Sequence, residues 1–210
     1  MKKIIIFDFD GTLIDSYSLI VDCINQLAPK YGFRTLNPKE LKNKPIKEII
    51  LELNISKLKL FSFTKNVKKL LESKINETNF FPEIIEIIKT LSKDFQLAII
   101  SSSKKEIIDN LLERNNLNKY FDFVYSDSSL FGKSIVIEKA IKKYNLIKEN
   151  IYYIGDEVRD IEAAKKTKIK SIAVTWGINS KELLVKSNPS YLITKPSEIF
   201  AILNKNTQDL

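Results

Sequence analysis

Short apolar runs divide the chain, and amphipathic segments separate most of them. The apolar runs cover residues 4–7, 96–100, 123–125, 151–154, 171–174 and 191–193. Apolar residues at helical spacing mark residues 104–116, 134–144 and 160–166. Unbroken apolar runs that alternate with helices are typical of a parallel sheet buried on both faces. The sequence therefore predicts an α/β protein with an open, doubly wound, Rossmann-like parallel sheet.

The interval between the first two apolar runs interrupts this alternation. Residues 16–79 contain apolar residues at helical spacing, such as Leu19, Cys23 and Leu27, and no convincing strand. Such a segment is too long for a crossover and too regular for a loop. We therefore expect a small α-helical domain at residues 16–79, inserted into a core formed by residues 1–15 and 80–210.

Acidic residues follow the first and fourth apolar runs directly. Asp8 and Asp10 end the first run in IIIFDFDGT, and Asp156 and Asp160 follow the fourth in GDEVRD. Right-handed crossovers bring the carboxyl ends of all parallel strands to one edge of the sheet, so these side chains are expected to converge. Two carboxylates about 4 Å apart repel by roughly 4 kcal/mol at an effective dielectric constant of about 20. A bound cation, hydrogen-bond donors or solvent must offset this repulsion.

Mg²⁺ is the cation that best suits this edge. The chain has no histidine, which argues against a zinc site of the usual type. Several carboxylates suit a hard cation, and Mg²⁺ is favoured where phosphate is the partner. Ser101 follows the second run and Lys133 the third. A carboxylate, a hydroxyl, an ammonium group and Mg²⁺ at one edge can support phosphoryl transfer through an aspartyl-phosphate.

These motifs resemble those of the haloacid dehalogenase superfamily, in its phosphoglycolate-phosphatase-like branch. The matching segments, in order, are FDFDGTLIDS, IISSS, GK before a helix, and YIGDEVRDIEAAK. The resemblance implies that Asp8 is the nucleophile and Asp10 the general acid and base. It further implies a helical cap over the substrate, which the inserted domain would form.

The resemblance also implies which residues bind phosphate and metal. Asp156 and Asp160 would hold Mg²⁺ together with Asp8 and the carbonyl oxygen of Asp10. Ser101 would bind phosphate, and Lys133 would steady the charge of the phosphoryl group. We expect the complete phosphate-binding set to consist of Gly11, Thr12, Ser101, Ser102 and Lys133.

Several residues depart from the family pattern or have open roles. Glu157 stands where the family commonly has a small polar residue, and we expect its side chain to be solvated rather than to tune metal binding. Arg34, in or near the cap, is expected at the surface, with a substrate contact as the alternative. Trp176 and Phe131 are expected to pack, although either could line the cleft.

Composition and charge restrict the partners. The chain carries 34 Lys and Arg against 26 Asp and Glu, a net charge of +8. The basic residues are mostly lysines scattered along helical segments, so we expect a small phosphorylated metabolite rather than nucleic acid as the partner. No apolar run approaches the roughly 20 residues of a membrane helix. With a single cysteine, Cys23, and no signal-like segment in MKKIIIF, we expect a cytoplasmic monomer or homodimer.

Other functions remain open at this point. A sugar-phosphate mutase would share Asp8, Asp10 and a cap, and would pass the phosphoryl group to a sugar hydroxyl instead of water. A non-catalytic phosphate-binding regulatory module would more plausibly have lost Asp8 or Lys133. A dehalogenase of this fold lacks the second aspartate, and a receiver domain lacks the helical insertion. A Mg²⁺-dependent phosphatase acting on a small phosphomonoester is the favoured interpretation.

Overall fold

The sheet lies at the centre of the computed structural model, which describes residues 2–53, 56–127 and 132–205. All of its strand pairs are parallel, and the strand order is β3-β2-β1-β4-β5-β6. The strands are β1 (Ile4–Phe7), β2 (Gln96–Ser101), β3 (Phe123–Ser126), β4 (Ile151–Gly155), β5 (Lys170–Val174) and β6 (Tyr191–Ile193). Their positions agree with the predicted runs to within a residue at each end, which confirms the predicted fold class.

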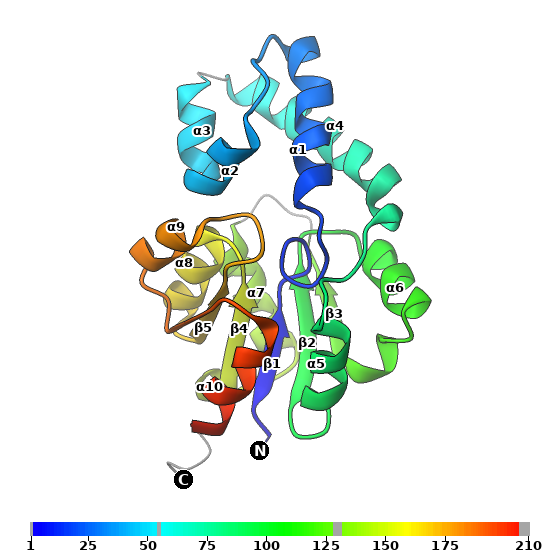
Figure 1. Ribbon diagram of the computed structural model, residues 1–210, viewed down its shortest axis with the longest axis vertical. Coiled ribbons are helices and arrows are strands. Elements are labelled where there is room, and N and C mark those ends of the chain that lie inside the picture. Colours follow the sequence, from blue (N-terminus) through cyan, green and yellow to red (C-terminus); the bar gives the residue numbers. More distant parts are fainter. Residues whose placement is uncertain (1, 54–55, 128–131, 206–210) are drawn as a thin grey trace.

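The apolar runs are unbroken because both faces of the sheet are buried. Alternate residues of β1 point to opposite faces, so that Ile5 packs in one apolar cluster and Ile6 in another. Helices α5 (Ile84–Leu91), α6 (Lys105–Arg114) and α10 (Ile199–Lys205) contribute to the first cluster. Helices α7 (Lys133–Lys143) and α8 (Val158–Thr167) cover the second (Figure 1). The result is three layers, with the sheet between two layers of helices.

The strand order places β1 and β4 side by side at a point where the chain reverses its direction across the sheet. From β1 the chain proceeds to β2 and β3 on one side, and it then crosses to β4, β5 and β6 on the other. Backbone pairing between β1 and β4 runs from Ile4 with Ile151 to Phe7 with Ile154. In open α/β sheets, ligands bind in the crevice outside the carboxyl ends of strands at such a reversal.

Of the five α-helices that the structure describes between β1 and β2, the first four lie above this edge of the sheet (Figure 1). They are α1 (Tyr17–Leu27), α2 (Pro38–Asn43), α3 (Ile46–Glu52) and α4 (Lys57–Lys74). Residues of α1, α2 and α3 form a small apolar cluster that includes Val21, Leu41 and Ile49. We call residues 16–79 the cap. Their division from the core as a separate domain stays a prediction, which this arrangement supports.

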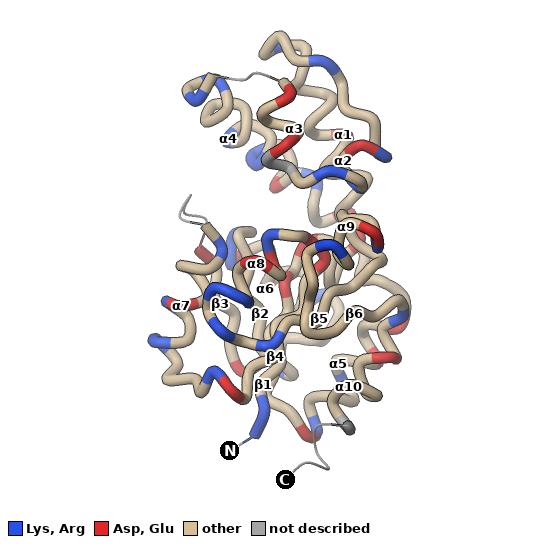
Figure 2. The backbone as a smooth tube through the Cα atoms, turned by 90° about the vertical axis from the view of Figure 1, so that its left-hand side faces the viewer, with Lys and Arg blue, Asp and Glu red and all other residues tan. Residues whose placement is uncertain are grey.

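Hydrogen bonds and an ion pair join the cap to the core on two sides. Ser180 donates its backbone N–H to the carbonyl oxygen of Lys42, at the end of α2, over 2.7 Å. On the other side, Nζ of Lys104 lies 2.8 Å from Oε2 of Glu72 on α4. The cap is therefore held over the carboxyl edge in this structure. Lys and Arg positions are interspersed with Asp and Glu along both cap and core (Figure 2).

The remaining elements are short. Helix α9 (Lys181–Lys186) lies between β5 and β6 in the chain. The 3-10 helices are η1 (Ala28–Tyr31), η2 (Ile75–Glu77), η3 (Asn118–Tyr120), η4 (Lys148–Asn150) and η5 (Pro196–Glu198). None of the helices in the described ranges is both long and apolar enough to cross a membrane.

The packing predictions agree with the structure for three side chains. Cys23 is buried, as expected for a core residue. Trp176 packs against the first apolar cluster and meets Phe81 edge to face. Arg34 is an exposed surface residue that forms an ion pair with Glu40 in the cap. Phe131 lies outside the described residues.

Candidate active site

Asp8 is the first residue after β1, and the sheet itself fixes its position. Its backbone N–H donates to the carbonyl oxygen of Ile154 over 2.8 Å, which continues the pairing of β1 with β4. Its side chain is almost fully buried, and Oδ1 accepts the backbone N–H of Phe9 over 2.8 Å. Burial raises the pKa of Asp8 from 3.8 to about 7, while nearby Lys133 acts in the opposite direction.

Asp156 and Asp160 approach Asp8 from the neighbouring strand. Asp156 follows the last residue of β4, and Asp160 lies in the first turn of α8. There Oδ2 of Asp160 accepts the backbone N–H of Glu157 over 2.9 Å. Gly155 permits this close packing, because a Cβ atom at that position would lie 2.4 Å from Cγ of Asp160.

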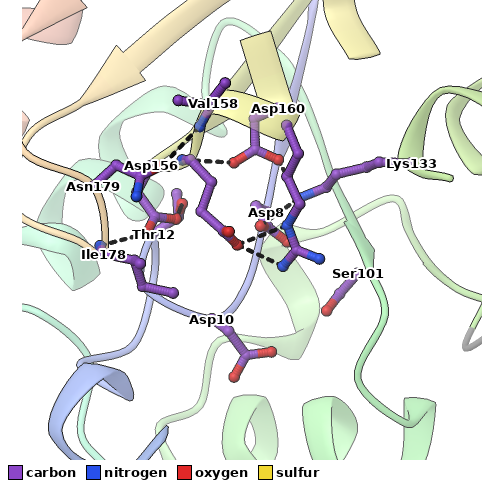
Figure 3. A network of polar contacts seen from close by, with 12 residues as sticks. Asp8, Asp10, Thr12, Ser101, Lys133, Asp156, Val158, Asp160, Ile178 and Asn179 are labelled. Carbon is purple, nitrogen blue, oxygen red and sulfur yellow. Dashed lines mark hydrogen bonds and ion pairs between the residues drawn. The ribbon is translucent and has the colours of Figure 1, made fainter. Parts of the chain in front are cut away.

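The three carboxylates form a compact buried group that suits a divalent cation. One oxygen each from Asp8, Asp156 and Asp160 lie within 4.8 Å of one another (Figure 3). Burial raises the pKa of Asp156 well above its usual range, and the charges of Glu157, Asp160 and Asp8 raise it further. Hard cations prefer carboxylate oxygens as ligands, and a bound cation would offset the repulsion between these three carboxylates. The donor set therefore fits Mg²⁺, as the sequence predicts.

Lys133 lies against two of these carboxylates. It is the first residue of α7, and its Nζ lies 2.5 Å from Oδ2 of Asp8 and forms a second ion pair with Asp160. Burial by itself would lower the pKa of Lys133, but Asp160 and Asp8 raise it well above the usual value. Lys133 is therefore charged at neutral pH, and it partly compensates the acidic group.

Asp10 lies apart from the group of three carboxylates (Figure 3). Its Oδ2 accepts the hydroxyl of Ser103 over 2.5 Å, whereas its Oδ1 is buried without a hydrogen-bond partner among the described residues. Burial raises its pKa, and the hydrogen bond from Ser103 limits that rise. A carboxyl group with a raised pKa and a free oxygen is suited to proton transfer. The predicted contact of the Asp10 carbonyl oxygen with metal stays a prediction.

The three serines after β2 have different environments. Ser101 is buried, and its Oγ accepts the backbone N–H of Ser103 over 3.0 Å. Ser102 has an exposed side chain, so its predicted contact with phosphate stays a prediction, as does that of Ser101. We assigned no site role to Ser103 from the sequence, so its contact with Asp10 was not predicted. Lys104, not Ser103, is the N-cap residue of α6. Only the position of Ser103 in the motif SSS pointed to a role for it.

The hydroxyl of Thr12, a predicted phosphate-binding residue, donates to Oδ1 of Asp156 over 2.7 Å. The other oxygen, Oδ2, accepts the backbone N–H of Ile178 over 2.7 Å. Gly11 has a left-handed backbone (φ 75°), and a Cβ atom there would lie 2.3 Å from Oδ2 of Asp156. Thr12 and Gly11 therefore help to place Asp156. Their predicted contacts with phosphate stay predictions.

Glu157 corrects one expectation. Its side chain is buried rather than solvated, and Oε1 accepts Nε of Arg159 over 2.8 Å. Glu157 also caps α8 through a reciprocal pair of hydrogen bonds with Asp160. The negative charge of Glu157 is the main reason why the pKa of Arg159 is raised. Sequence reasoning missed this pairing, although the two residues lie only two positions apart.

A cavity of about 370 Å³ adjoins Lys133, the residue that pairs with Asp8 and Asp160. The core contributes Ser101, Lys133 and Arg159 to its lining, and the cap contributes Thr64 and Lys68 from α4. Its size suits a small molecule. A ligand that enters it would meet Lys133 and Ser101 on the core side and α4 on the cap side.

Comparison with known proteins places the chain in a family. The family model described as "Haloacid dehalogenase-like hydrolase" matches residues 5–174. The chain belongs to this family of hydrolases. The match includes β1, the inserted helices and every predicted site residue, and it confirms the resemblance on which the predicted enzyme class depends.

Individual members of the haloacid dehalogenase-like hydrolases are similar over nearly the whole chain. A phosphoglycolate phosphatase from Synechococcus elongatus is 29% identical, over 93% of this chain and 94% of that protein. The pyrophosphatase PpaX from Listeria welshimeri is 27% identical, over 95% of each. A crystal structure described as a predicted phosphatase from Clostridium acetobutylicum superposes with a TM-score of 0.83, with 25% identity and full coverage of both chains.

Proposed function

We propose that this hydrolase is a Mg²⁺-dependent phosphatase that forms an aspartyl-phosphate on Asp8. One observation carries the proposal. Asp8 has an ammonium group on one carboxylate oxygen and lies within a compact group of three buried carboxylates, while Asp10, two residues further along, has a free buried oxygen. These are the groups that phosphoryl transfer through a carboxylate requires.

In the first step, a carboxylate oxygen of Asp8 attacks phosphorus. The ester P–O bond breaks as the new bond forms, and the protonated carboxyl of Asp10 gives its proton to the leaving oxygen. The raised pKa of Asp10 favours this protonated state. The leaving group then departs as an alcohol.

In the second step, a water molecule attacks the phosphorus of the aspartyl-phosphate. Asp10, now ionised, takes a proton from this water, and the bond between Asp8 and phosphorus breaks. Inorganic phosphate leaves, and both aspartates return to their initial states. Asp10 therefore serves first as an acid and then as a base.

Asp8 must be ionised to attack, although burial raises its pKa to about 7. The adjacent charge of Lys133 favours the ionised form. Asp8, Asp156 and Asp160 would hold Mg²⁺, which supplies further positive charge for the ionised carboxylates and the phosphoryl oxygens. Lys133 and the hydroxyl of Ser101 would stabilise the phosphoryl group from the protein side.

The similar proteins support this function. The phosphoglycolate phosphatase and the pyrophosphatase are both named for the hydrolysis of a phosphate group. The cap would exclude water from the reacting groups when a substrate is bound. The cytoplasmic location and the monomeric or homodimeric state stay predictions.

Phosphate release from 4-nitrophenyl phosphate tests the proposal. We expect hydrolysis with Mg²⁺, its loss in EDTA and its recovery when Mg²⁺ is restored. Hydrolysis that persists in EDTA would contradict the metal dependence. Transfer of the phosphoryl group to a sugar phosphate, with little release of inorganic phosphate, would instead favour the mutase alternative.

A further inference from the structure

The cavity beside Lys133 is lined by more cationic than acidic side chains among the described residues. Lys133 is already paired with two of the site's carboxylates. Lys68 and Arg159 also line the cavity, and they come from the cap and from α8 respectively. The lining contains one acidic residue among those described, Asp127, and its Oδ2 lies 3.0 Å from Nζ of Lys139. Two cationic groups are therefore left to face a ligand.

Lys68 is partly buried and lacks a carboxylate partner. Its Nζ donates to the carbonyl oxygen of Ser102 over 2.6 Å, and no carboxylate of the described residues lies within ion-pair distance. Burial lowers its pKa. The charges of Glu72 and Asp10 act on the Lys68 ammonium group from further away, but its direct contact is a carbonyl oxygen, so it can gain free energy from an anion in the cavity.

Arg159 presents a free part of its guanidinium group to the same cavity. Its Nε and Nη2 both contact a single oxygen of Glu157, at 2.8 and 2.5 Å. Its Nη1 has no hydrogen bond to any described residue, and its side chain is 47% exposed. Guanidinium groups bind carboxylates and phosphates through several parallel N–H donors. The contact with Glu157 fixes the side chain and leaves Nη1 available.

We propose that Lys68 and Arg159 form a second anion-binding subsite, which selects small phosphorylated substrates that carry a carboxylate or a second phosphate at the other end. This inference rests on the proposed phosphatase function, and it adds the class of substrate. Lys133 and Ser101 face the reacting phosphate, and the cap and α8 face the far end. Because Lys68 lies on the cap and also contacts Ser102, the second anion would bridge the cap and the core.

Lys68 has one competing role, because its bond to Ser102 could simply hold the cap over the core. A substitution that only loosened the cap would slow all substrates by the same factor. Loss of a subsite residue would slow a substrate with a second anionic group more than an analogue that carries the phosphate alone. The ratio of the two kcat/KM values therefore separates the roles.

The experiment compares phosphoglycolate with ethyl phosphate, which has a similar length and no second anion. For the wild-type protein we expect kcat/KM to favour phosphoglycolate. Lys68→Met should reduce this preference by about tenfold to a hundredfold, the usual effect of one charge-assisted hydrogen bond. Arg159→Gln should act in the same direction. A second series uses pyrophosphate in place of phosphoglycolate. Comparison of the two series shows whether the subsite prefers a phosphate or a carboxylate as the second anion.

Lys104→Met is the matched control. It removes the other lysine that bridges the core and α4, through Glu72, but Lys104 does not line this cavity. The control should leave the preference unchanged. Equal losses in Lys68→Met on phosphoglycolate and on ethyl phosphate would overturn the subsite, as would a wild-type protein that prefers neither phosphoglycolate nor pyrophosphate to ethyl phosphate.

A binding measurement separates failure of the subsite from failure of the proposed function. Calorimetry on the Asp8→Asn protein with Mg²⁺ should give tighter binding of phosphoglycolate or pyrophosphate than of ethyl phosphate. A further Lys68→Met substitution should remove this difference. If turnover is absent but the difference in binding holds, the subsite stands and the phosphatase proposal fails. If all three compounds bind equally, the subsite is wrong whatever the activity.

Discussion

The hydroxyl of Thr12 donates to Oδ1 of Asp156 over 2.7 Å, although 144 positions of sequence separate the two residues. This bond joins the turn after β1 to the end of β4. Because the backbone N–H of Ile178 binds the other oxygen of Asp156, both oxygens are held in place without any ligand. The position of this carboxylate, a predicted metal ligand, therefore depends on a residue that does not belong to the group of carboxylates.

Thr12→Val should weaken Mg²⁺ binding. Valine has the shape of threonine but no hydroxyl, so Oδ1 of Asp156 loses its donor inside the protein. Loss of a buried hydrogen-bond partner costs about 1–3 kcal/mol, and we expect a loss of stability in that range. Urea unfolding and the Mg²⁺ concentration at half-maximal activity are the two measurements. Thr12→Ser keeps the hydroxyl and should behave like the wild-type protein; wild-type behaviour of Thr12→Val would instead exclude this role.

Asp8→Asn should abolish turnover and leave the fold intact. The amide is close in size to the carboxylate but is not a nucleophile toward phosphorus, so no aspartyl-phosphate can form. Phosphate release and circular dichroism check the two parts of this prediction. Full activity in the variant, once deamidation has been excluded by mass spectrometry, would refute the covalent mechanism.

Asp10→Asn should reduce kcat by about 10²- to 10⁴-fold, the usual range for a positioned proton-transfer group. Asparagine cannot give a proton to the leaving oxygen. In this variant, the rate of the first step should fall less for a substrate with a good leaving group, such as 4-nitrophenyl phosphate, than for an alkyl phosphate. A rate that does not change on either substrate would remove Asp10 from the proton transfer.

Ser103→Ala should move the alkaline limb of the kcat profile to higher pH. Asp10 acts as an acid while it is protonated, so activity falls as pH rises through its pKa. Burial raises that pKa, and the bond from Ser103 lowers it. Without the hydroxyl the pKa rises further, and the protonated form persists to higher pH. Ser103→Thr restores the hydroxyl and should restore the profile. A limb at the same pH in all three proteins would show that Ser103 does not tune Asp10.

Mg²⁺ should stabilise the protein more at pH 8 than at pH 5. Burial raises the pKa of Asp156 in the folded protein. The pKa of Asp8 is likewise raised, from 3.8, the usual value for an aspartate, to about 7 in the folded protein. Between these values the folded protein holds protons that the unfolded chain has released, so stability without metal falls as pH rises. Mg²⁺ competes with those protons and binds the ionised form.

Thermal unfolding with and without Mg²⁺ measures this effect. A ligand at 100 times its Kd adds about 2.7 kcal/mol, which raises Tm by roughly 5 to 10 °C in a chain of this size. Asp156→Asn should reduce the shift at pH 8. An equal shift at pH 5 and pH 8 would contradict binding by these carboxylates.

Sequence alone was sufficient for the strands and for most of the residues at their ends. The two central strands, β1 and β4, are buried along their whole length, and their sequences are correspondingly apolar. Asp8, Asp156 and Asp160 follow such runs directly, and a parallel sheet brings the carboxyl ends of its strands to one edge. Their convergence could therefore be expected from local patterns and general topology, and the family resemblance added their roles.

Only the tertiary structure showed which partner each side chain takes. The bonds of Thr12 to Asp156 and of Ser103 to Asp10 join residues 144 and 93 positions apart, and no local pattern records which way a side chain turns in a crowded site. Glu157 was expected to be solvated, but the turn into α8 buries it against Arg159. Lys68 looked like one more lysine on a helix, and it lines the cavity because the cap is folded over the core. Periodicity and chain order fix which residues reach the edge of the sheet, whereas the packing of distant segments fixes their contacts and charge balance.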